Sequence, residues 1–266
     1  MTPDIGISGQ LSLDRTLPSF AVVIPMYNER RGAEVCVREV CAHLTRMPHR
    51  TRLIVVDDGS TDGTGEILTG LEAAEPKLFR VAHEKNRGYG AALQTGARCA
   101  HEHGFDYVLF MDSDLTNHPS DIPQFAARME QGFDVIKATR YRLGGHVRSV
   151  PLYRVLISKV GNQLARLLFR LPVTDCTNGF RAVKVKLLVR MSLEERRFPV
   201  IMEELYWCRF MACTYAQIPV TLTNRDATLR PTSFAYKPSV FYAYLKYPAR
   251  AWLGIKPRGL TDQENE

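Results

Sequence analysis

In the first half of the chain, short runs rich in valine, isoleucine and leucine alternate with longer segments whose apolar residues recur at helical spacing. The runs predict strands at about 20–25, 52–57, 78–83 and 106–111, and the segments between them predict helices near 30–46, 62–74 and 90–102. Strands that alternate with helices are typical of a parallel sheet covered by helices on both faces. The pattern therefore predicts an α/β fold.

The second half of the chain shows the same alternation less regularly. Its pattern predicts a helix near 120–131, a strand near 134–139, a helix from Leu152 to about Leu171, a loop at 175–180, a helix near 201–212 and a strand near 215–220. No internal repeat or clear linker divides the chain. We therefore expect an N-terminal arm at 1–19, one domain at 20–231 and a basic, aromatic tail at 232–266.

Polar and glycine-rich stretches follow the predicted strands of the first half. They are Pro25 to Glu29, Asp57 to Asp62, Asn86 to Gly90 and Asp112 to Asp114. In an open parallel sheet, ligands bind outside the carboxyl ends of the strands, because helix amino termini and loop amides converge there. The four stretches are therefore expected to surround one binding site.

The triplet Asp112-Ser113-Asp114 directly follows an apolar strand. Two carboxylates at positions i and i+2, where the backbone turns, can both reach one hard divalent cation, and Mg²⁺ or Mn²⁺ would bring a diphosphate with it. As a bare string the same triplet is usually a surface turn, because aspartate and serine favour turns. Its place at a strand end favours a metal site formed by Asp112 and Asp114.

Acidic residues also follow the first two strands. Asp57 and Asp58 are placed to accept hydrogen bonds from a base or a ribose, as carboxylates after a strand commonly do in nucleotide-binding folds. Pro25 lacks an amide donor and is expected to end the first strand, so that Tyr27 and Glu29 project towards the same ligand.

A structural alternative applies to these stretches, namely that they form ordinary turns into helices. Asn28, and Thr61 or Asp62, are then helix caps. The glycine-rich stretch 86–92 is weak evidence alone, because it lacks the full dinucleotide-binding fingerprint and the sequence has no Walker-type GK[ST].

The formal charge of +7 is unevenly distributed along the chain. Residues 135–174 contain eight basic and no acidic residues, and residues 227–260 contain six basic and no acidic residues. These two segments carry +14, so the remainder carries −7. Such segregation is expected where part of a protein faces phosphates or an anionic leaflet, the alternative being a solvated basic face.

Other features of the sequence indicate the compartment. No stretch is long and apolar enough to span a bilayer, and the first residues lack the features of a secretion signal, so we expect a cytoplasmic protein. The six cysteines show no CxxC pair and no metal-binding spacing. This favours buried thiols over a disulfide framework or a zinc site.

The strings VVIPMYNE, VVDDGSTDGT, NRGYGAALQTGA and MDSD follow one another over residues 22–114, and in this order they resemble the inverting glycosyltransferases of family 2. In the second half, ATRY followed by GG, DCTNGFRA, a helix with Glu203-Glu204, and IPV followed by Arg225 are similar to the dolichol-phosphate or polyprenyl-phosphate mannosyltransferase branch. The resemblance covers about 22–230. It implies a nucleotide-binding, glycosyltransferase A-type fold with a mostly parallel sheet, in which 20–231 is the catalytic domain.

Carried over position by position, the resemblance implies roles for single residues. The nucleotide contacts become Pro25, Tyr27, Glu29, Asp57 and Asp58. The diphosphate and metal residues become Asp112, Ser113 and Asp114, and the residues that meet the donor diphosphate or the acceptor phosphate become Arg140, Arg154 and Arg225.

Two positions depart from the pattern of this branch. Thr116 stands where the branch usually has glutamine, two residues after the second aspartate of the triplet. The stretch RDATLRPTSF stands where a Ser-Lys pair usually follows the arginine, which makes Arg230 a candidate replacement for the lysine.

The resemblance also implies a nucleotide-diphosphate sugar as donor, GDP-mannose first, and a polyprenyl or dolichyl phosphate as acceptor. A phosphate monoester, with a second pKa of about 6, is mostly dianionic at neutral pH and needs no catalytic base. Glu203 and Glu204 keep open a saccharide or protein hydroxyl as acceptor, because the helix could supply a base, unless the pair only stabilises the helix N-terminus. UDP-glucose or a UDP-N-acetylhexosamine is the alternative donor.

The tail mixes five aromatic residues with two basic ones and predicts a helix in the membrane interface, broken near Pro248. The alternative is a helix packed on the domain. We expect peripheral attachment at the cytoplasmic face of a membrane, or a membrane-anchored partner subunit. Two other classes are weighed against an enzyme: a nucleic-acid-binding protein, for which no motif is present, and a non-catalytic subunit that binds sugar nucleotides.

Overall fold

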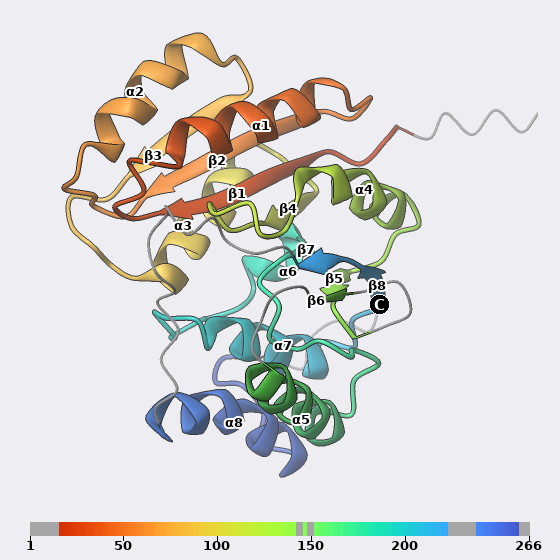
Figure 1. Cartoon of the computed structure of the whole chain (residues 1–266). Coiled ribbons are helices and arrows are strands. Elements are labelled where there is room, and N and C mark those ends of the chain that lie inside the picture. Colours follow the sequence, from red (N-terminus) through yellow and green to blue (C-terminus); the bar gives the residue numbers. More distant parts are fainter. Residues whose placement is uncertain (1–15, 142–145, 148–151, 223–237, 261–266) are drawn as a thin grey trace, which may run out of the picture.

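The computed structural model describes residues 16–141, 146–147, 152–222 and 238–260, and the side chains of 16–141, 156–221 and 240–260. A seven-stranded sheet passes through the molecule and has helices on both of its faces (Figure 1). The α/β class predicted from the hydrophobic pattern is confirmed.

The first half of the chain forms four parallel strands and the helices between them. They are β1 (Phe20–Met26), α1 (Ala33–Thr45), β2 (Thr51–Asp57), α2 (Thr64–Ala74), β3 (Leu78–Ala82), α3 (Tyr89–Glu102) and β4 (Tyr107–Phe110). Strand β1 pairs with β2 and β4, and β2 pairs with β3, all in parallel. The seven elements predicted here are all present in the predicted order.

The second half adds the other side of the sheet. Its elements are η1 (Pro119–Asp121), α4 (Ile122–Glu130), β5 (Val135–Thr139), β6 (His146–Val147), α5 (Leu152–Phe169), β7 (Arg181–Lys184), α6 (Val185–Leu188), α7 (Val200–Phe210), β8 (Tyr215–Pro219), β9 (Thr221–Leu222) and α8 (Pro238–Trp252). The sheet order is β3-β2-β1-β4-β7-β5-β8, and β6 and β9 form a separate pair. Only β7 is antiparallel to its neighbours in the described sheet, so the sheet is mostly parallel.

Three details differ from the sequence prediction. Strand β7 and helix α6, from 181 to 188, were not predicted. Strand β1 runs past Pro25, because Met26 still pairs with Asp57 of β2. Helix α8 is continuous through Pro248, so the predicted break there is wrong. A proline removes one helical hydrogen bond, and packing of α8 against α5 and α7 holds the helix together across that loss.

Both faces of the sheet are buried. Successive side chains of a strand point to opposite faces, so Phe20, Val22 and Ile24 pack in a core with α1, α2 and α4. Ala21 and Val23 pack in the other core, with α3, α6 and α7 and with parts of α5 and α8. Helix α3 lies very close to the sheet, since a Cβ placed on Gly96 would be 2.3 Å from a methyl carbon of Val23.

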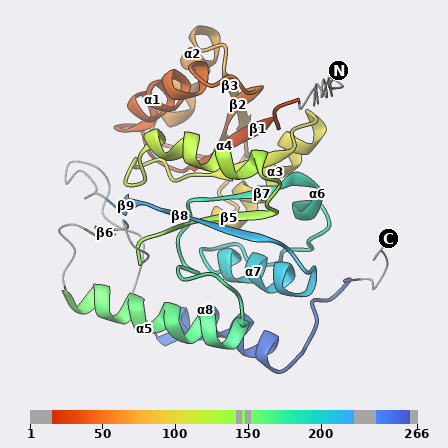
Figure 2. The same cartoon turned by 90° about the vertical axis from the view of Figure 1, so that its right-hand side faces the viewer.

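Helices α5 and α8 lie side by side at the end of the molecule opposite α1 and α2, with α7 between them and the sheet (Figures 1 and 2). One side of α8 is packed against the domain: Tyr247 is buried, and its ring lies 5.7 Å from that of Tyr206 in α7. None of the described helices is both long and apolar enough to cross a membrane.

Candidate active site

Carboxylates from two loops act on the thiol of Cys36 in α1: Glu29 from the loop after β1, and Asp112 and Asp114 from the loop after β4. Burial raises the pKa of Cys36, and the negative charges of Asp114, Glu29 and Asp112 raise it further. The effect of a charge on the pKa of another group weakens with distance, so these carboxylates lie near the thiol. The structure therefore brings together, outside the carboxyl ends of β1 and β4, acidic residues that are far apart in the sequence.

The loops after β1 and β2 are hydrogen-bonded to each other. Ser60 Oγ accepts a bond from the Asn28 amide (3.0 Å), and Asn28 Oδ1 accepts one from the Thr61 amide (2.8 Å). Asn28 has a φ of 55°, in the left-handed region, where asparagine is better tolerated than most residues. Asn28 thus joins the two loops, and the predicted capping of α1 by Asn28 is wrong, because the N-cap is Gly32.

Neither of the other two candidate caps is the N-cap of α2, which is Gly63, but Asp62 stabilises the turn before the helix. Its Oδ1 accepts from the amide of Thr64, the first residue of α2, at 3.1 Å. Its Oδ2 accepts from the Arg30 amide, also at 3.1 Å, in the loop after β1. These bonds hold the first residue of α2 in place and keep the turn before it next to the loop after β1.

The predicted nucleotide residues lie together on these two loops. Pro25, Tyr27 and Glu29 are half-buried, whereas Asp57 is buried and its Oδ1 accepts from the Ser60 amide at 3.0 Å. The assignment of these four residues to the nucleotide stays a prediction.

Asp58 anchors a neighbouring loop. Its Oδ1 lies 2.7 Å from His83 Nδ1 and accepts from the Arg87 amide at 2.8 Å, and its Oδ2 accepts from the Gly88 amide at 2.8 Å. The side chain is 3% exposed. Its observed role is therefore to hold the loop that enters α3, and the contact with a nucleotide implied by the resemblance stays a prediction.

The loop at 86–90 is also held from the other side by the segment before α7. The Gly90 amide donates to the carbonyl oxygen of Arg196 at 2.9 Å. A Cβ on Gly88 would lie 2.4 Å from that oxygen, and one on Gly90 would lie 2.0 Å from the carbonyl oxygen of Glu195. The glycines of the NRGYG string are required by this close approach of two backbones.

Glu203 and Glu204, considered above as catalytic bases, are both used in the structure. Glu203 is 3% exposed and accepts from the amides of Glu194 (3.0 Å) and Glu195 (2.8 Å), so it shapes the segment that covers the glycine loop. Glu204 is 1% exposed and pairs with Arg181. The alternative that either glutamate serves as a base for a hydroxyl acceptor is not supported by this geometry.

Asp112 is positioned by the start of α3. Tyr89 Oη donates to Asp112 Oδ1 at 3.1 Å, and the Tyr89 ring packs against that of Phe198 with centroids 4.6 Å apart. A Cβ placed on Gly179 would lie 3.3 Å from Asp112 Oδ2. A side chain at 179 would thus crowd this oxygen, and glycine leaves space beside it.

Asp114 shapes the turn after β4. Its Oδ1 accepts from both the amide (3.1 Å) and the hydroxyl (2.8 Å) of Thr116. Thr116, at the position where the branch usually has glutamine, is therefore a partner of Asp114. Ser113 lies half-buried between the two aspartates.

A buried ion pair lies beneath Asp112. Arg181 Nε donates to Glu204 Oε1 at 2.6 Å and Nη2 donates to Oε2 at 2.7 Å, and the guanidinium lies 4.4 Å from the ring centroid of Phe110. Burial lowers the pKa of Arg181, but the charges of Glu204 and then of Tyr89 and Asp112 raise it overall. The pair thus holds a guanidinium, whose charge Glu204 balances, in a fixed position close to the strand end.

Arg140 is likewise paired. Its Nε donates to Asp175 Oδ2 at 2.7 Å, and its Nη2 donates to Asp175 Oδ1 at 2.8 Å and to Thr177 Oγ1 at 3.1 Å. Burial raises the pKa of Asp175, but the charge and hydrogen bonds of Arg140 lower it overall. Among the described residues the Nη1 donors of Arg140 have no partner, so the side chain can still bind an anion.

Tyr244 of α8 lies near both this arginine and Asp112. Burial raises the pKa of Tyr244, the charge of Asp112 adds to the increase, and the charge of Arg140 opposes it. The hydroxyl therefore lies within electrostatic reach of both groups. Of the other predicted arginines, Arg225 and the side chain of Arg154 lie outside the described residues, although the backbone of Arg154 is in the first turn of α5.

The carboxylates of Asp112 and Asp114 fit a hard divalent ion. Carboxylate oxygens are the ligands that Mg²⁺ and Mn²⁺ prefer, and Gly179 leaves room beside one of them. In the part of the chain that the structure describes, no group of three or more histidine, cysteine or acidic residues is arranged to hold a metal by itself. A bound ion would thus need further ligands, such as diphosphate oxygens and water, which is how Mg²⁺ is usually held.

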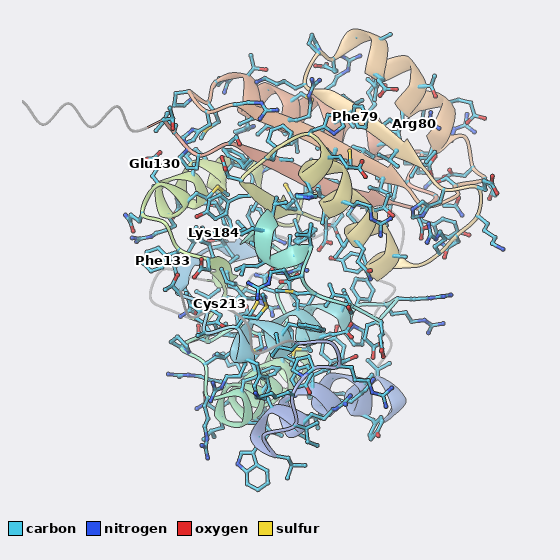
Figure 3. The ribbon with its side chains drawn as sticks, turned by 180° about the vertical axis from the view of Figure 1, so that it is seen from behind. Phe79, Arg80, Glu130, Phe133, Lys184 and Cys213 are labelled. Atoms are coloured by element: carbon cyan, nitrogen blue, oxygen red, sulfur yellow. The ribbon has the colours of Figure 1, made fainter. Side chains whose placement is uncertain are left out.

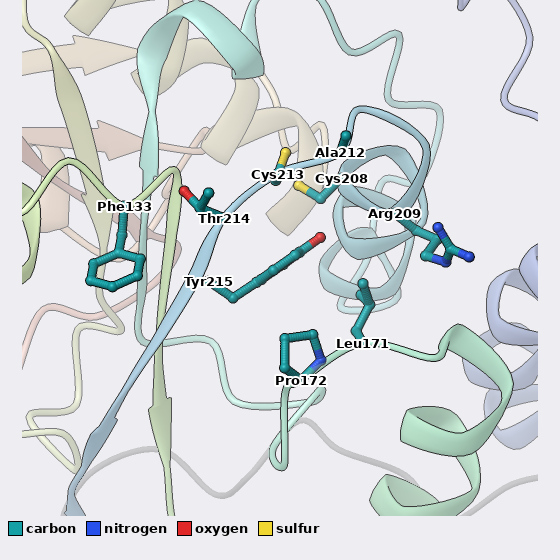
Figure 4. Close-up of a pocket in the computed structure, with 9 residues that line it drawn as sticks. All are labelled: Phe133, Leu171, Pro172, Cys208, Arg209, Ala212, Cys213, Thr214 and Tyr215. Carbon is teal, nitrogen blue, oxygen red and sulfur yellow. The ribbon is translucent and has the colours of Figure 1, made fainter.

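A cavity of about 490 Å³ lies elsewhere, between the N-terminal ends of β5 and β8 and the end of α7 (Figure 4). Its lining is mostly apolar and includes Phe133, Leu171, Tyr215 and the two neighbouring thiols of Cys208 and Cys213. Phe133 and Cys213 are both labelled in the view from behind (Figure 3). Since Asp112 follows the carboxyl end of β4, which is parallel to β5, this cavity is at the opposite edge of the sheet from the site.

The comparison with known proteins matches this arrangement. Residues 21–191 match the family described as Glycosyl transferase family 2. The chain belongs to glycosyl transferase family 2. The protein is therefore a glycosyltransferase, and the alternatives of a non-catalytic binding subunit and of a nucleic-acid-binding protein are overturned.

Two curated relatives of this glycosyltransferase carry informative names. It is 31% identical over 209 residues to the polyprenol monophosphomannose synthase of Mycolicibacterium smegmatis, covering 77% of each chain. It is 26% identical over 207 residues to the undecaprenyl-phosphate mannosyltransferase of Micrococcus luteus, covering 77% of this chain and 83% of the relative. The resemblance to this branch, inferred from the motifs, is confirmed.

Solved structures show the same fold. Glucosyl-3-phosphoglycerate synthase of Mycobacterium tuberculosis, in a complex with Mn²⁺, UDP and glucosyl-3-phosphoglycerate, gives a TM-score of 0.62 at 22% identity, covering 91% of this chain and 82% of the other. A complex of that enzyme with Mg²⁺ and UDP gives the same score. The glycosyltransferase A-type fold is confirmed.

Four residues near the site were not predicted as such: Tyr89, Asp175, Arg181 and Tyr244. Three of them stand inside strings already noted, Tyr89 in NRGYG and Asp175 and Arg181 in DCTNGFRA. Tyr244 stands in the tail, whose aromatic residues were assigned to a membrane interface. Their contacts with Asp112, Arg140 and Glu204 depend on the tertiary structure and have no local signal in the sequence.

Removal of the Tyr89 hydroxyl tests whether it positions Asp112. We expect Tyr89→Phe to lower kcat about 10- to 150-fold, the value of one hydrogen bond to a charged group of roughly 1.5–3 kcal/mol. The concentration of Mn²⁺ that gives half-maximal rate should rise as well, a readout that a purely structural role would not move. Tyr242→Phe, in an exposed residue of α8, is the matched control. An unchanged metal requirement in Tyr89→Phe would contradict the positioning role.

Proposed function

We propose that this glycosyltransferase transfers a sugar from a nucleotide-diphosphate sugar to a polyprenyl phosphate, with inversion at the anomeric carbon and with Mg²⁺ or Mn²⁺ as cofactor. The observation that carries the proposal is the combination of an acidic cluster at the strand ends with arginines nearby, while the two glutamates of α7 are buried in other contacts. A phosphate dianion needs no base, so this arrangement favours a phosphate acceptor over a hydroxyl. The names of the two curated relatives support the same acceptor class.

On the donor side, Tyr27, Glu29 and Asp57 face the nucleotide, with Pro25 ending the preceding backbone and Asp58 holding the adjacent loop. Asp112 and Asp114 would hold the divalent ion, with Ser113 beside them. When bound, the ion neutralises the negative charge that develops on the departing nucleoside diphosphate. Tyr89 keeps the Asp112 carboxylate in one orientation for this contact.

On the acceptor side, Arg140 orients the lipid phosphate through its Nη1 donors, and the resemblance assigns Arg154 and Arg225 to the same phosphate. An oxygen of the acceptor phosphate forms a bond to the anomeric carbon as the bond from that carbon to the diphosphate oxygen breaks. The electron pair leaves with the diphosphate, and no proton is transferred. Orientation and charge neutralisation therefore account for the catalysis.

We further propose that the protein acts at the cytoplasmic face of a membrane, where a lipid phosphate is presented. GDP-mannose is the first choice of donor, in line with the relatives' names, and UDP-glucose is the second, since a solved structure of similar fold was obtained with UDP-glucose and Mn²⁺. The membrane-anchored partner subunit considered above finds no support in the comparisons and is not part of the proposal.

A donor panel followed by an acceptor panel tests the function. With Mn²⁺ present, the matched nucleotide sugar at about 100 times its dissociation constant should stabilise the protein by about 2.7 kcal/mol, which a thermal-shift measurement detects. With that donor, transfer to a polyprenyl phosphate is expected, and transfer to the corresponding polyprenol or to a saccharide is not. Efficient transfer to a hydroxyl, with none to the phosphate, would contradict the proposal.

A further inference from the structure

The outer face of α5 is apolar and exposed. Its side chains Leu156, Val160, Leu164 and Leu167 are 61%, 61%, 42% and 64% exposed, and Ile157 is 39% exposed. With a turn of about 100° per residue, these five positions lie within an arc of about 100° on the helix. The sequence pattern predicted this helix, and the structure shows that its opposite side, with Asn162, Ala165 and Phe169, is the buried one.

Helix α8 and the residues after it continue this surface. Tyr242, Trp252, Leu253 and Ile255 are 74%, 57%, 63% and 43% exposed. Ala165 and Phe169 of α5 and Tyr247 of α8 are buried in the same core, so the opposite sides of both helices point away from the body. Figures 1 and 2 show the two helices side by side at one end of the molecule. We call the exposed apolar residues of α5 and of 242–255 the outer face.

Basic residues flank the outer face. Lys159 and Arg166 of α5 and Arg170, directly after the helix, are exposed, and Lys159 and Arg166 project on one flank of the apolar stripe, at about 60–80° from Leu156 on the helix. The segments 135–174 and 227–260, which contain both helices, have no acidic residue. An apolar face of this kind with cations and an exposed tryptophan at its border fits the interface of an anionic bilayer.

The inner sides of the same helices reach the active site. Asn162 Oδ1 accepts from the amides of Cys176 (2.7 Å) and Thr177 (3.2 Å), in the loop that holds Asp175 and Gly179. Ser158 Oγ lies 2.6 Å from the hydroxyl of Tyr141, the neighbour of Arg140. Tyr244 on α8 lies within reach of Asp112 and Arg140. The outer face is thus separated from the site by the single layer that these two helices form.

We propose that the outer face docks the protein on an anionic lipid bilayer, with α5 as the principal anchor and α8 beside it. The inference rests on the proposed function, because a membrane-borne phosphate acceptor would then reach Arg140 from the side on which the protein sits. The sequence alone placed membrane contact in the tail. The structure assigns it to a surface shared by two helices that are about ninety residues apart in the chain.

A vesicle-binding experiment tests the docking. The full chain is sedimented with vesicles of phosphatidylcholine, or of phosphatidylcholine with 30% phosphatidylglycerol, about the anionic content that attracts basic protein surfaces. We expect binding to the anionic vesicles and at least a tenfold weaker partition for the variant L156Q/V160Q/L164Q/L167Q. Val35→Gln, at a residue of α1 that is 63% exposed on the other end of the molecule, should bind as the unmodified protein does.

Two outcomes would overturn the docking proposal. One is equal vesicle binding by the quadruple variant and the unmodified protein, provided that both show the same thermal unfolding. The other is a dimer in light scattering that the quadruple variant abolishes, since the face would then be an interface between two copies of the chain. The docking proposal is supported if the quadruple variant is folded and monomeric and no longer binds the anionic vesicles that the unmodified protein binds.

A soluble acceptor separates this proposal from the proposed function. With a short-chain, water-soluble polyprenyl phosphate, the quadruple variant should transfer sugar at the rate of the unmodified protein, because none of its four changes touches the site. With the long-chain acceptor in anionic vesicles its rate should fall in proportion to its binding. If neither protein transfers sugar to either acceptor, the proposed function is wrong, while the vesicle result still decides the docking.

Discussion

Replacement of Asp114 by alanine is expected to abolish sugar transfer and to leave the fold intact. Asp114 lies in the loop after β4, where its negative charge acts on the Cys36 thiol together with those of Glu29 and Asp112, and we propose that it helps to hold a divalent ion with the donor diphosphate. Loss of one preorganised electrostatic contact of this kind lowers kcat by about 10²–10³-fold. Initial rates at saturating donor and Mn²⁺, with circular dichroism to verify folding, measure the effect.

Asp114→Asn separates charge from shape. Asparagine Oδ1 can still accept the two bonds from Thr116, so the turn after β4 should survive while the negative charge is lost. This variant should therefore be nearly as inactive as the alanine variant. Thr116→Val, which removes only the hydroxyl bond, is the matched control and should retain most of the activity. Full activity of Asp114→Ala, with metal chelated and donor saturating, would reject the role given to this residue.

Replacement of Glu204 by leucine is expected to destabilise the protein by about 3–5 kcal/mol, because it leaves the fully buried guanidinium of Arg181 without its partner. The double variant Arg181→Met/Glu204→Leu should recover much of this loss, since a buried ion pair replaced by apolar side chains of similar volume is often close to neutral. Urea unfolding of the two single variants and the double variant gives the coupling energy.

The same double variant also tests the catalytic relevance of the pair. If the Arg181 guanidinium near Asp112 helps to stabilise the departing diphosphate, the double variant should be stable yet show a lower kcat, and it should not require more Mn²⁺, because the loss of one cation does not weaken the binding of another. Glu34→Leu, at the exposed partner of Arg38, is the matched control and should change stability by less than about 1 kcal/mol. A loss of under 1 kcal/mol in Glu204→Leu would contradict the assigned role of the buried pair.

The first half of the fold was predictable because its elements are local and regular. The run Ala21 to Ile24 is apolar without interruption, as expected for a strand buried on both faces, and α1 shows its apolar stripe at 36, 37, 40, 41 and 44. Strand β7 was missed for the opposite reason. It has only four residues, begins with an arginine and passes directly into α6, so no periodicity marks it.

Site residues that directly follow a strand could be predicted from the sequence. Residues whose contact partners are distant in the sequence could be predicted less well. Asp112, Asp114 and Glu29 are brought together by the order of the parallel strands, as the motif positions indicated. Arg181 was not predicted to be buried, because its partner Glu204 lies 23 residues later and charged residues are rarely buried without one. The outer face of α5 was not recognised as exposed, because apolar spacing alone does not distinguish a helix face that packs against protein from one that stays exposed.

The contact of Gly96 with Val23 determines the height at which α3 sits above the sheet. Because Gly96 places no side chain between the helix and the strand, a methyl group at this position would push α3 away from the sheet. The N-terminal end of the helix, which carries Tyr89, would then move away from Asp112, and the hydrogen bond from Tyr89 Oη to Asp112 Oδ1 would be lost. Gly96, on the buried side of α3, is thus needed to keep the Asp112 carboxylate in its orientation at the carboxyl ends of the strands.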